Sequence, residues 1–207
     1  MLLLGHMSKQ IIIGFCGPTK SGKSTAAKFL EIQGFMSVGF ADQLKRDCRT
    51  IFDFSDVQLW GDLKDVIDDR YGLTPRYVMQ KYGTDFMREM IDDNWWVNKC
   101  LDTVLTGLNT GARYKSDRGF MLEPVIYPPY KGAVITDVRF GNEIKAIKKA
   151  GGYVVRLLRA DLAAHMHKAE ATATGLPANM FDLIIDNRDI EVTDLGQQVI
   201  NFYRSKV

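Results

Sequence analysis

Cysteine is scarce in this chain, and the few cysteines present do not form a recognisable scaffold. The 207 residues include Cys16, Cys48 and Cys100, with no Cys-x-x-Cys pair among them. Three widely spaced cysteines argue against a disulfide framework and against a zinc ribbon. Reduced thiols are typical of cytosolic proteins, so we expect a cytoplasmic protein.

The sequence also lacks long apolar runs and an excess of charge of either sign. No apolar stretch approaches the ~18 residues that a membrane-spanning helix needs. With 27 basic and 25 acidic residues, the net charge of +2 leaves no broad basic face. We therefore expect neither a membrane nor a polymeric nucleic acid as partner.

The length favours one domain, since 207 residues correspond to roughly 1.4 domains of about 150 residues. The opening segment ends in Gly5-His6 before Met7 and resembles a cloning junction. We expect residues 1–6 to be a cloning remnant and residues 7–207 to form a single domain.

Short apolar runs alternate with segments of helical period along the chain. We predict strands at residues 10–16, 35–40, 132–136, 153–158 and 183–185. We predict helices at residues 24–33, through most of 41–108, and at 142–150 and 192–203. Strands separated by helices indicate an α/β fold of three layers, with a parallel sheet flanked by helices. Residues 109–131 and 161–180 show no clear period; the first stretch is either a functional loop or poorly ordered.

One motif specifies a phosphate-binding loop. Residues 17–24 read Gly-Pro-Thr-Lys-Ser-Gly-Lys-Ser and match G-x-x-x-x-G-K-[ST] at every fixed position. The glycines let successive N–H groups converge on an anion, and the following helix adds its positive dipole end. A chance match in a glycine-rich turn is the alternative, but the strand before and the helix after favour nucleotide binding. The predicted ATP-binding residues are Gly17, Thr19, Lys20, Ser21, Gly22, Lys23, Ser24 and Thr25.

The end of the strand at residues 132–136 carries a second candidate site. Asp137 there could hold a water bound to the Mg²⁺ that the Ser24 hydroxyl ligates, and Arg139 could bind a phosphoryl group. A strand-end turn aspartate and a surface ion pair are the structural alternatives. Both residues at one strand end strengthen the functional interpretation.

Four stretches together resemble the deoxynucleoside monophosphate kinases of tailed bacteriophages. The first is the phosphate loop, and the second runs from Gln80-Lys81-Tyr82-Gly83-Thr84 through Arg88 to Trp96-Val97. The third is Thr136-Asp137-Val138-Arg139-Phe140 with Asn142-Glu143, and the fourth is Gly175-Leu176-Pro177 before Asp186-Asn187. The segment His167-Lys168-Ala169-Glu170 departs from the family's lid pattern, and residues 109–131 have no family counterpart.

The resemblance implies a P-loop kinase fold with a helical monophosphate-binding region, about residues 41–108, and a lid, about residues 160–180. It implies phosphoryl transfer from ATP to a deoxynucleoside 5′-monophosphate, with Mg²⁺, and it suggests a homodimer. Such transfer needs in-line positioning and neutralisation of charge on the moving group. The predicted catalytic residues are Lys23, Arg88, Asp137 and Arg139.

Several residues are candidates for the acceptor site. Thr84 and Arg88 share a helix face and could both meet the acceptor phosphate, while Gln80 could read the base. Asp42 could bind the sugar 3′-hydroxyl and Lys45 the phosphate. Ordinary surface or capping roles are the alternative for each of these residues.

Trp95 and Trp96 point about 100° apart on a helix, so we expect one in the core and one near the sugar. The family pattern favours Trp96 for the sugar.

Basic residues near the lid, Arg156, Arg159 and Lys168, are candidates to close on the triphosphate, with Arg159 assigned to ATP. Asn187 could touch adenine. His165 and His167 have no third ligand in the sequence pattern, so a solvated lid is favoured over a metal site there.

Two other functions remain open from the sequence. One is another small-molecule P-loop kinase, such as a dephospho-coenzyme A or cytidylate kinase. The other is a binding module that uses ATP as a switch without transferring phosphate.

Overall fold

A five-stranded parallel sheet forms the centre of the protein. The computed structural model describes residues 10–111, 113–114, 122–123, 130–159 and 175–207. The strand order is β2-β5-β1-β6-β7 and every neighbouring pair is parallel. Their bounds are Phe35–Val38 (β2), Gly132–Val138 (β5), Ile11–Cys16 (β1), Tyr153–Leu158 (β6) and Leu183–Asp186 (β7). The five predicted strands and their parallel arrangement are confirmed.

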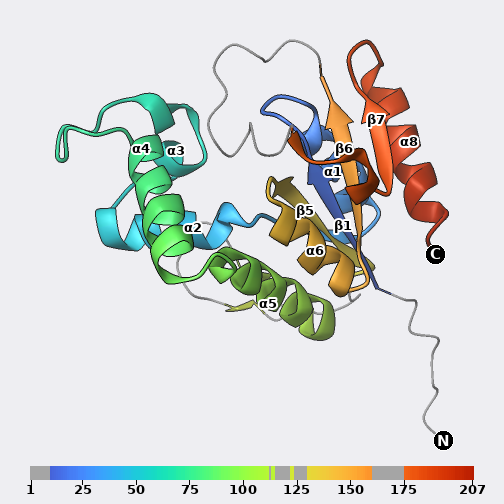
Figure 1. Ribbon diagram of the computed structural model, residues 1–207, viewed down its shortest axis with the longest axis horizontal. Coiled ribbons are helices and arrows are strands. Elements are labelled where there is room, and N and C mark those ends of the chain that lie inside the picture. Colours follow the sequence, from blue (N-terminus) through green and yellow to red (C-terminus); the bar gives the residue numbers. More distant parts are fainter. Residues whose placement is uncertain (1–9, 112, 115–121, 124–129, 160–174) are drawn as a thin grey trace, which may run out of the picture.

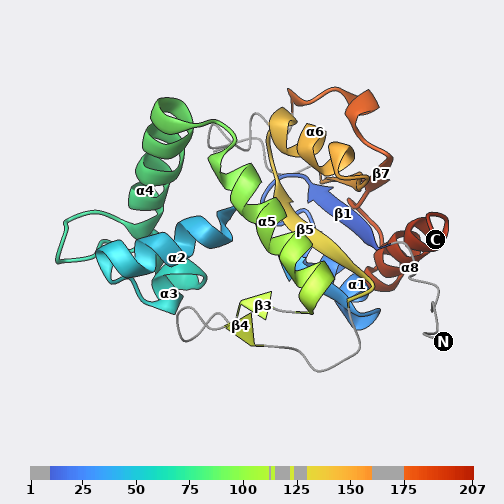
Figure 2. The same ribbon diagram turned by 90° about the horizontal axis from the view of Figure 1, so that it is seen from below.

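Helices cover both faces of this sheet (Figures 1 and 2). Helices α1 (Lys23–Ile32) and α8 (Val192–Arg204) bury Leu30 and Val199 against one face. On the other face lie α5 (Trp95–Thr110) and α6 (Gly141–Lys149). Strand β1 is buried at all six positions, as its Ile-Ile-Ile-Gly-Phe-Cys composition requires for a strand covered on both sides. The predicted three-layer α/β fold is confirmed.

A separate group of helices follows β2 and has its own small core. It contains α2 (Ala41–Phe52), α3 (Asp56–Leu59), the 3₁₀ turn η1 (Asp62–Asp65), α4 (Pro75–Gln80) and η2 (Lys81–Ile91). Phe54 and Leu59 are buried in that core. The predicted start of α4 is confirmed: Pro75 occupies the first turn, and the Thr74 hydroxyl accepts the N–H of Tyr77 at 3.2 Å.

Two details of this region differ from the expectations. The helix η2 is a π-helix, so its turns are wider than those of the expected α-helix, and Asp92 N donates to Met87 O, five residues back. Asn94 precedes α5 without capping it through its side chain. Its side-chain oxygen instead accepts a hydrogen bond from Asn142.

The two stretches without a period are described only in part. Within residues 109–131, β3 (Arg113–Tyr114) pairs antiparallel with β4 (Leu122–Glu123). The expected lid lies mostly outside the described residues, and so do His165, His167 and Lys168. The last residues of the lid range form a 3₁₀ turn, η3 (Ala178–Met180). No helix within the described ranges is long and apolar enough to cross a membrane.

Candidate active site

The phosphate loop joins β1 to α1 in a backbone conformation that only its glycines permit. Gly17 and Gly22 have φ values of +151° and +96°. A Cβ at Gly17 would lie 2.5 Å from the Leu157 carbonyl oxygen, and one at Gly22 would lie 2.5 Å from Asn187 Nδ2. Both glycines of the motif are therefore needed for conformation and for space, because the loop packs closely against the ends of β6 and β7.

Lys23 folds back over this loop. Its ammonium group donates to the carbonyl oxygens of Gly17 at 2.8 Å and of Pro18 at 2.5 Å, and lies 3.4 Å from Ser21 Oγ. These acceptors hold the charge against the loop, where phosphate oxygens could replace them as its partners. Ser24, in the first turn of α1, is exposed, so its hydroxyl is accessible to a ligand.

Two residues from neighbouring strand ends brace the loop. Arg159 follows β6 and donates from Nη1 to the Lys20 carbonyl at 2.9 Å. Asn187 follows β7 and donates from Nδ2 to the Ser21 carbonyl at 2.8 Å. Arg159, predicted to bind ATP, thus contacts the backbone of the phosphate loop. Asn187, which could touch adenine, uses its amide nitrogen to contact the same loop.

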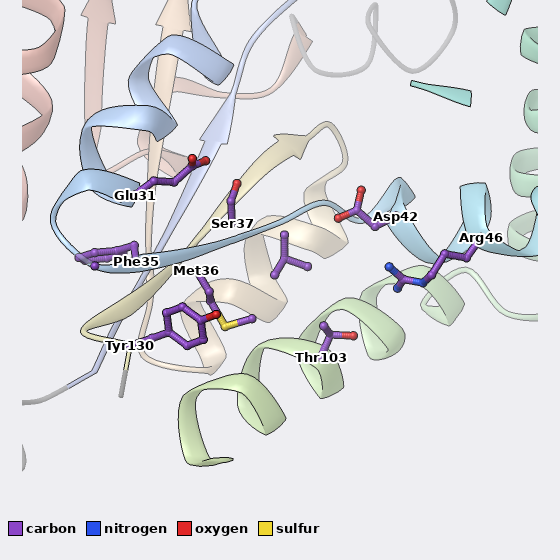
Figure 3. A pocket seen from close by; sticks show the side chains of 10 residues that line it. Glu31, Phe35, Met36, Ser37, Asp42, Arg46, Thr103 and Tyr130 are labelled. Atoms are coloured by element: carbon purple, nitrogen blue, oxygen red, sulfur yellow. The ribbon is translucent and has the colours of Figure 1, made fainter. Parts of the chain in front are cut away.

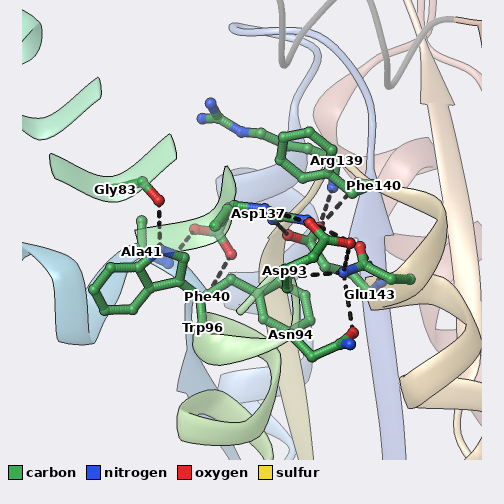
Figure 4. A network of polar contacts seen from close by, with 12 residues as sticks. Phe40, Ala41, Gly83, Asp93, Asn94, Trp96, Asp137, Arg139, Phe140 and Glu143 are labelled. Atoms are coloured by element: carbon green, nitrogen blue, oxygen red, sulfur yellow. Dashed lines mark hydrogen bonds and ion pairs between the residues drawn. The ribbon is translucent and has the colours of Figure 1, made fainter. Parts of the chain in front are cut away.

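Asp137 lies where β5 ends and faces the start of α2. Its carboxylate accepts the N–H groups of Phe40 at 2.7 Å and Ala41 at 3.0 Å (Figure 4). A carboxylate at a helix N-terminus is favourable because the helix dipole is positive there. Each oxygen keeps a second lone pair, which could accept a hydrogen bond from a metal-bound water.

Asp42 lies beside Asp137, with Gly39 between them. A Cβ at Gly39 would be 3.1 Å from an oxygen of each carboxylate. Asp42 also accepts the Gly39 N–H at 2.7 Å. Burial, and then the negative charge of Asp137, raise the pKa of Asp42 above its usual range. A cation or a hydroxyl donor at this position would relieve that repulsion.

A pocket of about 430 Å³ runs along the free edge of β2 (Figure 3). Asp42 and Arg46 line one end, and Tyr130 lines the other. The pocket therefore adjoins the carboxylate expected to bind the acceptor sugar.

Arg88 requires a correction. It was expected to meet the acceptor phosphate, but only 8% of it is exposed. Its guanidinium donates to Glu143 Oε1 at 3.0 Å, to Asp93 Oδ1 at 2.9 Å and to Asn142 Oδ1 at 3.0 Å. A guanidinium engaged with these three acceptors is part of the protein interior, so Arg88 is neither a phosphate ligand nor a solvated helix charge here.

Trp96 also requires a correction. It was expected to form a wall beside the sugar, but it is 4% exposed and its indole N–H donates to the Gly83 carbonyl at 2.8 Å. This bond ties α5 to the π-helix (Figure 4). Trp95 is the half-buried member of the pair. The exposed aromatic surface nearby belongs to Phe86, which stacks on Tyr82 with ring centroids 6.2 Å apart.

The remaining predicted residues occupy scattered positions. Arg139 is half-buried, and its guanidinium points away from the Glu143 network (Figure 4). Lys45 lies over the Trp60 ring, with its nitrogen 5.4 Å from the centroid, so the structure places it against an aromatic face. Gln80 and Thr84 are half-buried on α4 and η2.

Glu143 was not assigned a role from the sequence. It is 2% exposed, and its Oε2 accepts the N–H groups of Arg139 at 2.7 Å and Phe140 at 3.0 Å. A glutamate three residues after the start of a helix can reach back to that start, and this spacing was the signal available in the sequence. Burial, opposed by these backbone hydrogen bonds, raises the pKa of Glu143 to about 7.

Comparison with known proteins assigns the family. Residues 41–199, more than half of the chain, match the family described as "Deoxynucleotide monophosphate kinase". The chain is also similar to the "Putative deoxynucleotide monophosphate kinase" of Acanthamoeba polyphaga mimivirus. The two are 34% identical over 187 residues, which cover 87% of this chain and 91% of that protein.

Solved structures share the fold at low sequence identity. Shikimate kinase from Acinetobacter baumannii, in complex with shikimate, superimposes with a TM-score of 0.51 at 14% identity, covering 96% of each chain. A sugar kinase from Janibacter sp. HTCC2649 gives a TM-score of 0.51 at 12% identity, covering 94% of this chain and 95% of that chain. These likenesses show a kinase-type α/β fold, and the family match supplies the rest: the chain belongs to the deoxynucleotide monophosphate kinase family.

Proposed function

We propose that this kinase transfers the γ-phosphoryl group of ATP to a deoxynucleoside 5′-monophosphate and so forms the diphosphate. The observation that carries the proposal is the shared sheet edge. The phosphate loop with Lys23 lies at the end of β1, and Asp137 and Arg139 lie at the end of β5, which is paired with β1. Ligands of open parallel sheets bind outside the carboxyl ends of the strands, so donor and acceptor would meet there.

On the donor side, the loop from Gly17 to Thr25 would hold the triphosphate through its backbone N–H groups. Lys23 would exchange its present carbonyl partners for phosphate oxygens. Arg159 lies against the loop backbone at Lys20 and would face the triphosphate from the β6 side. These positive groups would offset the charge that develops on the transferring group.

Mg²⁺ fits the residues on both sides of the loop. Mg²⁺ usually keeps several waters and binds through few protein groups together with substrate phosphates. The exposed Ser24 hydroxyl would be the direct ligand, and Asp137 would accept a hydrogen bond from a water bound to the ion. The ion would neutralise charge on the phosphate oxygens. Among the described residues there is no cluster of three or more side chains that could hold a metal ion.

On the acceptor side, Asp42 would receive the sugar 3′-hydroxyl, next to the pocket along β2. Arg139 would bind the phosphoryl group during its transfer, because the Arg139 guanidinium projects from the end of β5 (Figure 4). Gln80 and Thr84 remain candidates for the base and the acceptor phosphate. The phosphate oxygen of the acceptor attacks the γ-phosphorus, and ADP leaves with the electron pair of the broken P–O bond.

The test is ATP turnover coupled to each acceptor in turn: dAMP, dCMP, dGMP, dTMP, their ribonucleotide counterparts and dephospho-coenzyme A. We expect acceptor-dependent ADP formation with at least one deoxynucleotide, and a much slower rate with Lys23→Ala. ATP consumption that no acceptor stimulates would contradict the kinase proposal and favour a binding module.

Three further properties belong to this proposal. The three cysteines are free and buried, which supports a reducing, cytoplasmic environment. The near-balanced charge supports a small-molecule substrate without a polymeric nucleic-acid partner. A homodimer, suggested by the family resemblance, would be recognised by light scattering as twice the mass of the 23.4 kDa chain.

A further inference from the structure

A buried carboxylate connects the strand end to the helical region. Glu143, in the first turn of α6, is 2% exposed and uses both of its oxygens. Oε2 accepts hydrogen bonds from the backbone N–H groups of Arg139 and Phe140 (Figure 4). Oε1 accepts a hydrogen bond from Nη1 of Arg88. One side chain thus joins the loop after β5 to the π-helix.

Phe140 is held from a second direction. The Arg88 guanidinium carbon lies 3.8 Å from the centroid of the Phe140 ring, a close cation–π contact. The other side of the guanidinium is fixed by Asp93 and Asn142. The residue directly after Arg139 is therefore clamped through its backbone by Glu143 and through its ring by Arg88.

A buried ion pair of this kind is weak evidence of a stabilising role, because the cost of desolvating the two charges can exceed their attraction. Removing two charges from water costs several kcal/mol each, and well-packed apolar residues often stabilise a fold as well or better. Buried polar groups of this kind are retained in some proteins because they specify one conformation. Here the specified conformation is that of the backbone at Arg139, since both constraints converge on the Arg139–Phe140 segment.

We propose that Glu143 is a positioning residue: together with Arg88 it fixes the backbone at Arg139 so that the Arg139 guanidinium reaches the transferring phosphoryl group. The proposal rests on the proposed kinase function and deepens it. Glu143 touches no substrate, because both oxygens face protein donors. Its effect on the rate passes through Arg139.

A double-mutant cycle tests this coupling. Above pH 7, where Glu143 is ionised, Glu143→Gln keeps the size of the side chain but removes its charge. This weakens its hydrogen bonds with the two backbone N–H groups and with Arg88. We expect kcat to fall about 10- to 100-fold, as for a misplacement of about 1 Å, with little change in the KM for ATP. Because Arg139 is the residue being positioned, the double variant Glu143→Gln/Arg139→Ala should have a kcat less than twofold below that of Arg139→Ala alone.

Asp182→Asn is the matched control. Asp182 makes the same kind of contacts, accepting the Val154 N–H at 2.8 Å and Lys148 of the same helix α6 at 3.3 Å. It lies at the opposite edge of the sheet, before β7. The same carboxylate-to-amide change there should leave kcat near wild type, and its loss in the Arg139→Ala background should be equally small.

The outcomes separate the possible failures. Losses that multiply in the double variant, or a normal kcat in Glu143→Gln, would overturn the positioning role. Parent enzyme inactive with every acceptor would instead overturn the proposed function. Should Glu143→Gln not fold, Arg88→Lys takes its place in the cycle, because lysine keeps the charge but loses the planar contact with Phe140. The same criterion then applies.

Discussion

The phosphate loop and the helical region of residues 41–108 are stabilised in different ways. In the loop, consecutive backbone groups and two glycines with positive φ form the site, and Lys23 bonds to carbonyls five and six residues away. In the helical region, Arg88 reaches Glu143, which is 55 residues away. A local motif can be recognised from spacing alone, whereas a buried long-range network depends on the packing of separate elements.

The comparison is tested most strongly at Arg88. Above pH 7, where Glu143 is ionised, Arg88→Ala should lower the free energy of unfolding by about 3–5 kcal/mol, because it leaves the Glu143 charge buried without its partner. Urea denaturation measures the loss. Arg76→Ala is the control, since Arg76 pairs with the exposed Asp65 and should cost no more than about 1 kcal/mol. A stable Arg88→Ala protein whose only defect is a raised acceptor KM would restore Arg88 to the phosphate site.

Lys23→Ala, in the phosphate loop, should lower activity and leave stability nearly unchanged. The activation barrier should rise by about 2–4 kcal/mol, because the transferring phosphoryl group loses a preorganised charge. The thermal midpoint should change little, since the contacts of Lys23 stay within its own loop and involve no distant element. Turnover and thermal unfolding of the same sample provide both values. Near-normal turnover would remove the phosphate-loop assignment.

The pH dependence of the free energy of unfolding should show the raised pKa of Glu143. Its pKa is about 7 in the folded protein against an ordinary 4.5, so the folded state keeps a proton that the unfolded state releases. The contribution of Glu143 to the free energy of unfolding is largest below about pH 4.5 and decreases as the pH rises to 7, above which it stays constant. The total decrease is up to about 3 kcal/mol.

Glu143→Gln removes this titration, so the comparison isolates it from other carboxylates. The difference in unfolding free energy between parent and variant should decline between pH 4.5 and 7. A constant difference across that window would show that Glu143 is already ionised in the folded protein at low pH.

The smallest expected effect concerns the sugar. With Trp96 buried, the stacked and exposed Phe86 is the better candidate for an apolar wall against a 2′-hydroxyl. Such a wall would favour deoxynucleotides by about 1–3 kcal/mol in kcat/KM. Phe86→Ala should reduce the ratio of dGMP to GMP turnover, and Met90→Ala, exposed on the same helix, should not. An unchanged ratio in Phe86→Ala would place the wall elsewhere.

Much of the architecture could be predicted because strands and amphipathic helices follow from local periodicity. The five strands were found from short apolar runs, and their parallel pairing was expected from the alternation of strands and helices. The π-helical turns from Lys81 were not predicted, because the spacing of apolar residues does not distinguish the wide turns of a π-helix from those of an α-helix.

The residues of the candidate site likewise fall into those that the local sequence predicts and those that depend on tertiary packing. The sequence by itself determined the phosphate loop, since φ > 0 at Gly17 and Gly22 and a lysine at a fixed spacing are local requirements. Only the tertiary structure decided that Arg88 and Trp96 face inward, and that Glu143 joins two segments. Whether a polar side chain contacts solvent or a buried partner depends on which distant element packs over it, and that is a property of the folded chain.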